Sequence, residues 1–246
     1  MKALEATDVS HSYGDVQALS DVSVEIARGV TALVGVNGAG KSTLLMALAG
    51  GLRPDKGCVR IEGLDLYGRS HRKRGLTNVA FVPQLPQFPK NLRAVEAVSY
   101  LAWMRGCPAV EAPNRARDAL GQVGLGAQTN KKLGTLSGGM LRRVALAQAL
   151  ASRAEVLLLD EPSTGLDPRR RREMVDLLKD LPGTVLISSH VMEDVADLAE
   201  RVIVLDEGRI KFNGDVTDLG RLAPTDVADH RRLEAGFLSL TSGSAP

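Results

Sequence analysis

Aromatic residues are scarce in this chain of 246 residues, at 3% of the composition. The core must therefore be built from Leu, Val, Ile and Ala, which suits parallel strands covered by helices. Cysteine is scarce too, because Cys58 and Cys107 stand alone with neither C-x-x-C spacing nor a nearby histidine. This excludes a disulfide framework and a zinc site of the usual spacing. Two isolated cysteines fit a reducing compartment.

No apolar run comes near the roughly 18 residues that a membrane helix needs. The segment MKALEATDVS carries no apolar signal. Charge is balanced, with 31 basic and 29 acidic residues, and the one local excess is Arg169 to Arg172. We interpret this run as a solvated helix face, since nucleic-acid surfaces usually need more cations with aromatics among them. We expect no nucleic-acid partner, and any membrane role would need another protein.

Short apolar runs and helical patterns divide the chain, and 44% apolar residues allow a sizeable core. The segments KALEATDVS and DVSVEIA alternate as half-buried strands do, and VTALVG is a continuous apolar strand before a glycine-rich turn. Later, EVLLLD, PRRRREMVDLLKDL, GTVLISS and VMEDVADLAE alternate strand and helix before the hairpin pattern of RVIVLDEG and RIKFNG. This order predicts an α/β fold with a mostly parallel sheet and N-terminal antiparallel strands.

A stretch from about residue 85 to 136 differs from its surroundings. It has several prolines and two helical patterns, RAVEAVSYLAWMRG and RARDALGQVGL. We expect a helical subdomain inserted into a core domain of residues 1–214, followed by a C-terminal tail of residues 215–246. The last segment, SGSAP, is expected to be frayed.

The segment GVNGAGKS, from Gly35 to Ser42, lies between a predicted strand and a predicted helix and matches G-x-x-x-x-G-K-[ST]. The N–H groups of such a loop and the helix N-terminus form a phosphate site. We expect Lys41 to contact the β- and γ-phosphates and Ser42 to coordinate Mg²⁺. The alternative is a glycine-rich turn that only caps a helix. The other expected nucleotide contacts here are Asn37, Gly38, Ala39, Gly40 and Thr43.

Two carboxylates close the buried strand in the segment EVLLLDEP. Asp160 is expected to hold the Mg²⁺ shell, as in nucleotide hydrolases with this kind of phosphate loop. Glu161 follows it and can polarise an attacking water as general base. Alone, such a pair is more often a loop or a cap. Together with the phosphate loop it predicts hydrolysis, with ATP and Mg²⁺ as ligands.

A glycine-rich helix start, LSGGMLRR, lies 24 residues before Asp160. Ser137 can cap this helix, and Gly138 and Gly139 let a ligand approach the backbone near the positive end of the helix dipole. The segment resembles the signature motif of ABC ATPases. There the motif contacts the γ-phosphate held by another subunit, so that two ATP molecules lie in a head-to-tail dimer. The family usually has glutamine where Met140 stands, which affects only the polar contact of that side chain.

Five further residues resemble family positions in the same order along the chain. Tyr13 resembles the aromatic that stacks on adenine, with Val16 near the same ring. Gln84 resembles the glutamine that joins the Mg²⁺ site, with Ser42 and Asp160, and senses the helical subdomain. Asp167 in STGLDP resembles an aspartate that bridges two subunits, and His190 a switch histidine that contacts the γ-phosphate.

The resemblance covers nearly the whole chain, from Tyr13 to about residue 214, and implies a P-loop NTPase fold of the ABC type. It implies an ATP-hydrolysing transporter subunit in which Glu161, His190 and Lys41 are catalytic. It further implies a separate transmembrane permease subunit and a homodimer, or a heterodimer with a related ATPase. The expected location is the cytoplasm, on the inner face of the cell membrane.

The tail segment LEAGFLSLT resembles the end of ATPases that serve drug, antibiotic or bacteriocin exporters, which favours export of a drug, antibiotic or peptide. One alternative is an importer ATPase. Another is a family member outside transport, such as a regulatory, repair or assembly factor. The transported substrate is not encoded here, because a membrane subunit would hold that site.

Overall fold

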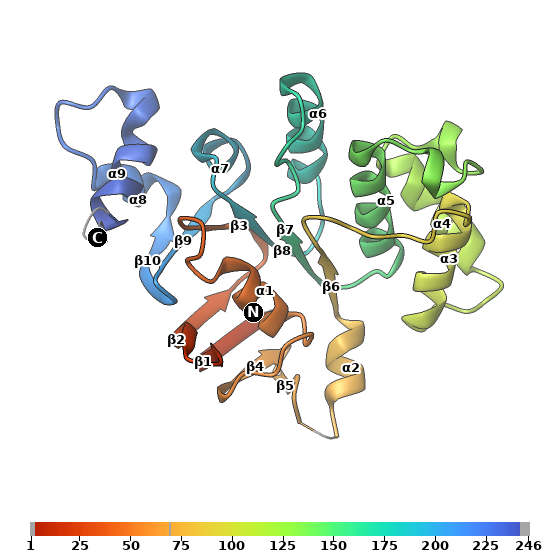
Figure 1. The fold of residues 1–246 in the computed structure, drawn as a ribbon, viewed down its shortest axis with the longest axis horizontal. Coiled ribbons are helices and arrows are strands. Elements are labelled where there is room, and N and C mark those ends of the chain that lie inside the picture. The colour runs from red at the N-terminus through yellow and green to blue at the C-terminus, as the bar shows by residue number, and fades with distance from the viewer. Residues whose placement is uncertain (1–2, 69, 242–246) are drawn as a thin grey trace.

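The computed structural model describes residues 3–68 and 70–241, and its six-stranded sheet carries the architecture (Figure 1). The strand order is β10-β9-β3-β8-β7-β6. The four contacts from β9 to β6 are parallel, and β10 is antiparallel to β9. The strands are β3 (Gly29–Val34), β6 (Val79–Val82), β7 (Val156–Asp160), β8 (Thr184–Ser189), β9 (Arg201–Asp206) and β10 (Arg209–Asp215).

A second, antiparallel sheet of order β2-β1-β4-β5 lies beside the first. Helix α1 (Lys41–Leu48) places Leu44, Leu45 and Leu48 in one apolar cluster with residues of both sheets. This packing holds α1 in place, with its first turn near the carboxyl ends of the parallel strands (Figure 1). The strands are β1 (Leu4–Tyr13), β2 (Val16–Ile26), β4 (Lys56–Ile61) and β5 (Leu64–Asp65).

Three helices form the layer at the right of Figure 1. They are α3 (Ala94–Met104), α4 (Ala112–Gln122) and α5 (Gly138–Ala151). Their buried side chains join Leu157, Leu159, Val185 and Ile187 of β7 and β8 in one cluster. The stretch from 85 to 136 thus holds helices, as expected, and α5 packs on them directly after it. The subdomain boundary at residue 136 stays a prediction.

The remaining helices lie along the sheet and at its end. Helix α6 (Pro168–Lys179) begins after Asp167, whose carboxylate accepts a hydrogen bond from the N–H of Arg170. Helices α7 (Met192–Leu198), α8 (Val216–Arg221) and α9 (Arg232–Thr241) share a small apolar cluster with β3 and β9. The expected fraying of SGSAP lies outside the described residues. The short elements are α2 (Arg72–Thr77), which was not predicted, and the 3₁₀ turns Gly126–Gln128, Leu133–Thr135 and Asp229–Arg231.

Parallel strands bring their carboxyl ends to one edge of a sheet, where ligands bind in open α/β folds. Here β3, β6, β7 and β8 all end at that edge. The phosphate loop, Gln84, the pair Asp160–Glu161 and His190 follow these strands in turn. The sheet therefore assembles in space what the sequence spreads over more than half of the chain.

Candidate functional site

The phosphate loop is shaped by glycines that no other residue could easily replace. Gly38 and Gly40 have φ of 85° and 101°, in the left-handed region that favours glycine. A Cβ on Gly40 would lie 2.5 Å from the carbonyl oxygen of Ala18, and one on Gly35 would lie 2.3 Å from that of Leu205. The loop thus wraps tightly against β2 and the end of β9, and its chain turns into α1 without a side-chain cap.

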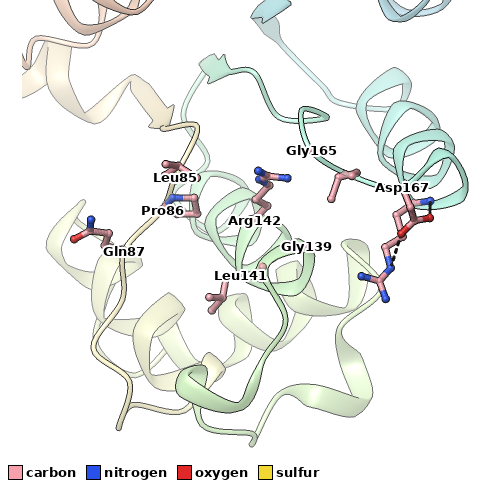
Figure 2. A pocket seen from close by; sticks show the side chains of 11 residues that line it. Leu85, Pro86, Gln87, Gly139, Leu141, Arg142, Gly165 and Asp167 are labelled. Carbon is pink, nitrogen blue, oxygen red and sulfur yellow. Dashed lines mark hydrogen bonds and ion pairs between the residues drawn. The ribbon is translucent and has the colours of Figure 1, made fainter.

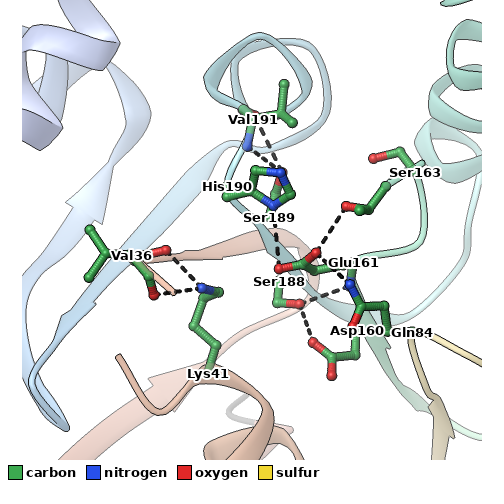
Figure 3. Close-up of polar contacts among 12 residues, drawn as sticks. Val36, Lys41, Gln84, Asp160, Glu161, Ser163, Ser188, Ser189, His190 and Val191 are labelled. Atoms are coloured by element: carbon green, nitrogen blue, oxygen red, sulfur yellow. Dashed lines mark hydrogen bonds and ion pairs between the residues drawn. The ribbon is translucent and has the colours of Figure 1, made fainter. Parts of the chain in front are cut away.

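Lys41 lies in the concave side of this loop, with 6% of its surface exposed. Its Nζ donates hydrogen bonds to the carbonyl oxygens of Gly35 (2.7 Å) and Val36 (3.0 Å) (Figure 3). Burial lowers the pKa of Lys41, while the nearby carboxylates of Glu161 and Asp160 oppose that shift. The ammonium group is therefore held in place and only partly solvated. A cation in this state interacts strongly with a phosphate.

Asp160 ends β7 and is buried at 7% exposure. Its Oδ1 accepts a hydrogen bond of 2.6 Å from the hydroxyl of Ser188, which lies opposite it in β8. The oxygen of Ser188 also accepts the N–H of Glu161 at 2.9 Å. One hydroxyl thus fixes the direction of both acidic residues (Figure 3).

The carboxylate of Glu161 is the meeting point of three segments. Its Oε2 accepts hydrogen bonds from Nε2 of Gln84 (2.9 Å) and from the hydroxyl of Thr164 (3.0 Å). Its Oε1 lies 3.3 Å from Nδ1 of His190. Only 12% of the Glu161 side chain is exposed, against 45% for His190. The carboxylate is therefore oriented from both sides, with a histidine at its open edge (Figure 3).

Tyr13 and Val16 face each other across the β1–β2 hairpin and are 48% and 69% exposed. His11 meets the Tyr13 ring edge to face, with 4.8 Å between ring centroids. The hairpin lies beside the phosphate loop, since β2 continues to the Ala18 carbonyl that Gly40 approaches. An open aromatic face next to a phosphate site is where a base could stack.

The signature residues form a separate group. Gly138, Gly139 and Asp167 line a cavity of about 460 Å³ between α5 and the loops around Pro86 and Gly165 (Figure 2). Ser137 caps α5, accepting the N–H of Met140 at 3.4 Å, and lines an adjoining hollow. None of the phosphate-loop residues lines this cavity. The structure thus brings most predicted residues together at one sheet edge and leaves these four apart from it.

Several residues that organise the site were missed by sequence reasoning. Ser188 and Thr164 orient the two carboxylates, and Ser163 donates a 2.6 Å hydrogen bond to Asp194. Serine and threonine are common on strands and in loops, so their type carries little signal. Only the strand register, which pairs Asp160 with Ser188, could have indicated one of them.

The residues present fit a nucleotide with a hard divalent cation. The first turn of α1 carries no acidic residue to repel an anion, and Ser42 is exposed there. Gln84 donates its amide nitrogen to Glu161, which turns its oxygen to the other side. A serine hydroxyl, an amide oxygen and an aspartate carboxylate are ligands that Mg²⁺ accepts alongside phosphate oxygens.

The sequence profile of the ABC transporter family matches residues 19–164, more than half of the chain. A putative ABC transporter ATP-binding protein of Geobacter sulfurreducens is 41% identical over 88% of each chain. A daunorubicin resistance ATP-binding protein of Streptomyces coeruleorubidus is 34% identical over 99% of this chain and 78% of its own. A sulfate/thiosulfate import ATP-binding protein of Synechocystis sp. is 36% identical over 86% of this chain and 60% of its own.

Solved structures agree in fold. An ATP-binding subunit of an ABC transporter has a TM-score of 0.83 at 25% identity and covers 97% of this chain and 99% of its own. A dimeric ATP-binding cassette in a post-hydrolysis state, bound to ADP and Pi, has a TM-score of 0.78 at 27% identity, covering 86% and 98%. The predicted fold is confirmed, and the chain belongs to the ABC transporter family, whose ATP-binding domain it carries.

Proposed function

We propose that this chain hydrolyses ATP and thereby powers transport through a separate membrane subunit. The observation that carries the proposal is the carboxylate of Glu161, oriented by Gln84 and Thr164 and next to His190. A carboxylate held this way beside a phosphate loop can accept a proton from an attacking water. Family membership makes ATP hydrolysis the expected activity, and the link to transport is the proposal's further step.

The positions of the site residues support the following proposed roles. Lys41 binds the β- and γ-phosphates with the N–H groups of the loop and the start of α1, and Tyr13 stacks on the base. Ser42, Gln84 and Asp160 would hold Mg²⁺, which would supply positive charge to the phosphate oxygens. His190 contacts the γ-phosphate from the open edge of Glu161. The residues proposed to bind nucleotide are Tyr13, Val16, Asn37, Gly38, Ala39, Gly40, Lys41, Ser42, Thr43 and Gln84, together with Ser137, Gly138, Gly139 and Asp167 on the side that faces the other subunit.

The separate position of Ser137, Gly138, Gly139 and Asp167 supports a dimer. The start of α5 offers backbone N–H groups and a capping hydroxyl to an anion, yet the phosphate loop of the same chain does not line its cavity. A second copy of this chain, or a related ATPase, would bring its own γ-phosphate there. The dimeric solved cassette supports this arrangement.

Export is the proposed direction of transport. The tail segment LEAGFLSLT supports it, and so does the daunorubicin resistance relative, which matches nearly the whole chain. The import relative matches less of this chain and extends well beyond it. We propose a drug, antibiotic or peptide as the cargo, and a location on the inner face of the membrane. No helix within the described residues is long and apolar enough to span a bilayer.

The substitution Glu161→Gln tests the catalytic proposal. The amide keeps the size of the side chain but cannot accept the proton of water, so turnover should fall at least about 100-fold. ATP binding should persist, because the phosphate loop is untouched, and an ATP-bound dimer should accumulate. Hydrolysis assays and light scattering with ATP and Mg²⁺ measure both. Near-normal turnover by the variant would remove Glu161 from this role.

The contact with the membrane subunit is proposed beside Gln84, at Leu85, Pro86 and Phe88. Leu85 is 72% exposed and sits at the rim of the cavity in Figure 2, which is unusual for a large apolar side chain. Phe88 is half-buried against the helices, so its substitution would also disturb packing. A short partner helix with an apolar stripe could pack there.

Leu85→Asp is the cleaner test of this contact. It should abolish co-purification with the membrane subunit while ATP binding by the isolated chain persists, because the phosphate loop is untouched. Val110→Asp is the control, since Val110 is 86% exposed in the same helical region. If the Leu85 variant still binds its partner, or if both variants lose it equally, the contact lies elsewhere.

A further inference from the structure

The sequence predicted that the arginine run at the start of α6 forms a solvated helix face. The structure shows this for only part of the run. The side chains of Arg169 and Arg170 are 89% and 58% exposed, but that of Arg171 is only 32% exposed. Arg171 turns toward α7, where its Nε donates a 2.8 Å hydrogen bond to Asp194. One member of the run therefore has a partner inside the protein.

Asp194 is a buried carboxylate, with 4% of its surface exposed. Its Oδ1 accepts the hydrogen bond from Arg171, and its Oδ2 accepts a 2.6 Å hydrogen bond from the hydroxyl of Ser163. Desolvation acts to lower the pKa of Arg171, but its hydrogen bond to Asp194 and the charge of Asp194 raise it on balance. A buried charge satisfied on both oxygens is tightly constrained in position.

The three members of this network come from three different segments. Ser163 lies two residues after Glu161, in the loop that leads to Asp167. Asp194 lies on α7, four residues after His190. Arg171 lies on the first turns of α6, which starts where that loop ends. Asp194 thus joins the segment after Glu161 to the segment after His190.

Oε1 of Glu161 and Nδ1 of His190 lie 3.3 Å apart, and the proposed chemistry requires that this distance be kept. The two residues follow the ends of different strands, and 45% of the His190 side chain is exposed. A short link between the two following segments limits how far they can drift apart. A shift of about 1 Å at a reacting group can cost on the order of 100-fold in rate.

We propose that Asp194 is a positioning residue for hydrolysis, which with Ser163 and Arg171 holds the Glu161 loop and the His190 segment in their working separation. Its carboxylate oxygens bind Ser163 and Arg171, so it acts through the two catalytic side chains. The inference rests on the function proposed above for Glu161 and His190. It predicts a loss in kcat rather than in ATP affinity, because the phosphate loop takes no part in the network.

The test compares Asp194→Asn with Glu193→Gln in the purified protein. Asparagine keeps the shape of Asp194 but loses the charge that binds Arg171, and kcat should fall about tenfold or more. The dissociation constant for ATP should change less than about threefold. Glu193 is the matched control, because it lies on the same helix and contacts the same Arg171 at 3.4 Å but is 83% exposed. Its variant should keep kcat within about twofold.

Ser163 supplies a second variant if Asp194→Asn folds poorly. Ser163→Ala cuts only the link to the Glu161 loop and leaves the pair of Arg171 and Asp194 intact, so kcat should fall about three- to tenfold. Ser163→Thr, which restores a hydroxyl, should recover most of it. A purely structural role predicts something else, a lower Tm with unchanged kcat per folded molecule, and that result would overturn the proposal.

Hydrogen exchange separates failure of this inference from failure of the proposed function. In Asp194→Asn, amide exchange should rise together in residues 163–166 and 189–192, and exchange in α1 should not change. This readout needs no turnover. Coupled exchange in a protein that never hydrolyses ATP would refute the proposed function alone. Unchanged exchange and kcat, with Glu161→Gln inactive, would refute the positioning role alone.

Discussion

The phosphate loop and the neighbourhood of Glu161 are built in opposite ways. Lys41 finds its two hydrogen-bond acceptors within six residues of itself. The carboxylate of Glu161 accepts a hydrogen bond from Gln84, 77 residues earlier, and its N–H donates one to the hydroxyl oxygen of Ser188, 27 residues later. The first half of the site is local and depends on glycines. The second half depends on the register of three parallel strands, so damage far away in the sheet can reach it.

Lys41→Met should show the largest effect of breaking the local half. Methionine has a similar length but no charge, so the phosphates lose a direct, partly desolvated cation. ATP affinity should fall at least about 100-fold, measured by calorimetry, while the geometry around Glu161 stays intact. If affinity fell less than tenfold, the backbone N–H groups would carry the binding and Lys41 would not.

The pH dependence sharpens the same comparison. Burial in the folded state lowers the pKa of Lys41 below its ordinary value of 10.5, which the unfolded chain keeps. Between the folded-state pKa and the unfolded-state pKa, the unfolded chain therefore binds more protons than the folded chain. The stability of the wild type relative to Lys41→Met should therefore rise with pH in that window. ATP affinity of the wild type should fall there, as the charge is lost. Thermal unfolding and calorimetry at a series of pH values measure both trends.

Gly40→Ala should give an intermediate effect, with Gly38→Ala as its matched control. Both glycines have positive φ, so an added Cβ costs about 1 kcal/mol at either position. Only at Gly40 would the Cβ also meet a carbonyl oxygen, that of Ala18 at 2.5 Å, while at Gly38 nothing lies within 4 Å. Gly40→Ala should lose about 2–4 kcal/mol of stability in denaturant titrations. Equal losses would mean that contact with β2 does not limit the loop.

Met140→Gln should have the smallest effect. The Met140 side chain is half-buried against the helical cluster, and its N–H already caps on Ser137. The backbone at Gly138 and Gly139 carries the expected contact with the opposite ATP, so hydrolysis should change less than about tenfold, or 1.4 kcal/mol. A hundredfold gain in steady-state rate would show that this chain is a weakened ATPase.

Sequence reasoning found the fold and the named motifs, because each motif is a local pattern with a local physical cause. The run VTALVG, the loop GVNGAGKS and the helix that follows specify one another within about 20 residues. Ser188 and Asp194 escaped it, since their roles arise only when β7 and β8 pair and α7 folds back. Thr164 binds Glu161 from only three residues away, but a threonine in a loop carries little signal by its type. The expectation that Arg171 lies on a solvated helix face was wrong for the same reason. Its partner Asp194 is buried and lies 23 residues later in the chain, while its sequence neighbours Arg169 and Arg170 are exposed.

The residue at position 161 must tolerate a backbone φ of 45° and must also carry the proposed catalytic carboxylate. In that left-handed region glycine, asparagine and aspartate have the least backbone strain, and valine and isoleucine have the most. A saturation library selected only for folded protein should enrich the first group. The same library selected for ATP turnover should retain glutamate alone. Comparing the two enrichment profiles at this single codon would separate what the turn requires from what the chemistry requires.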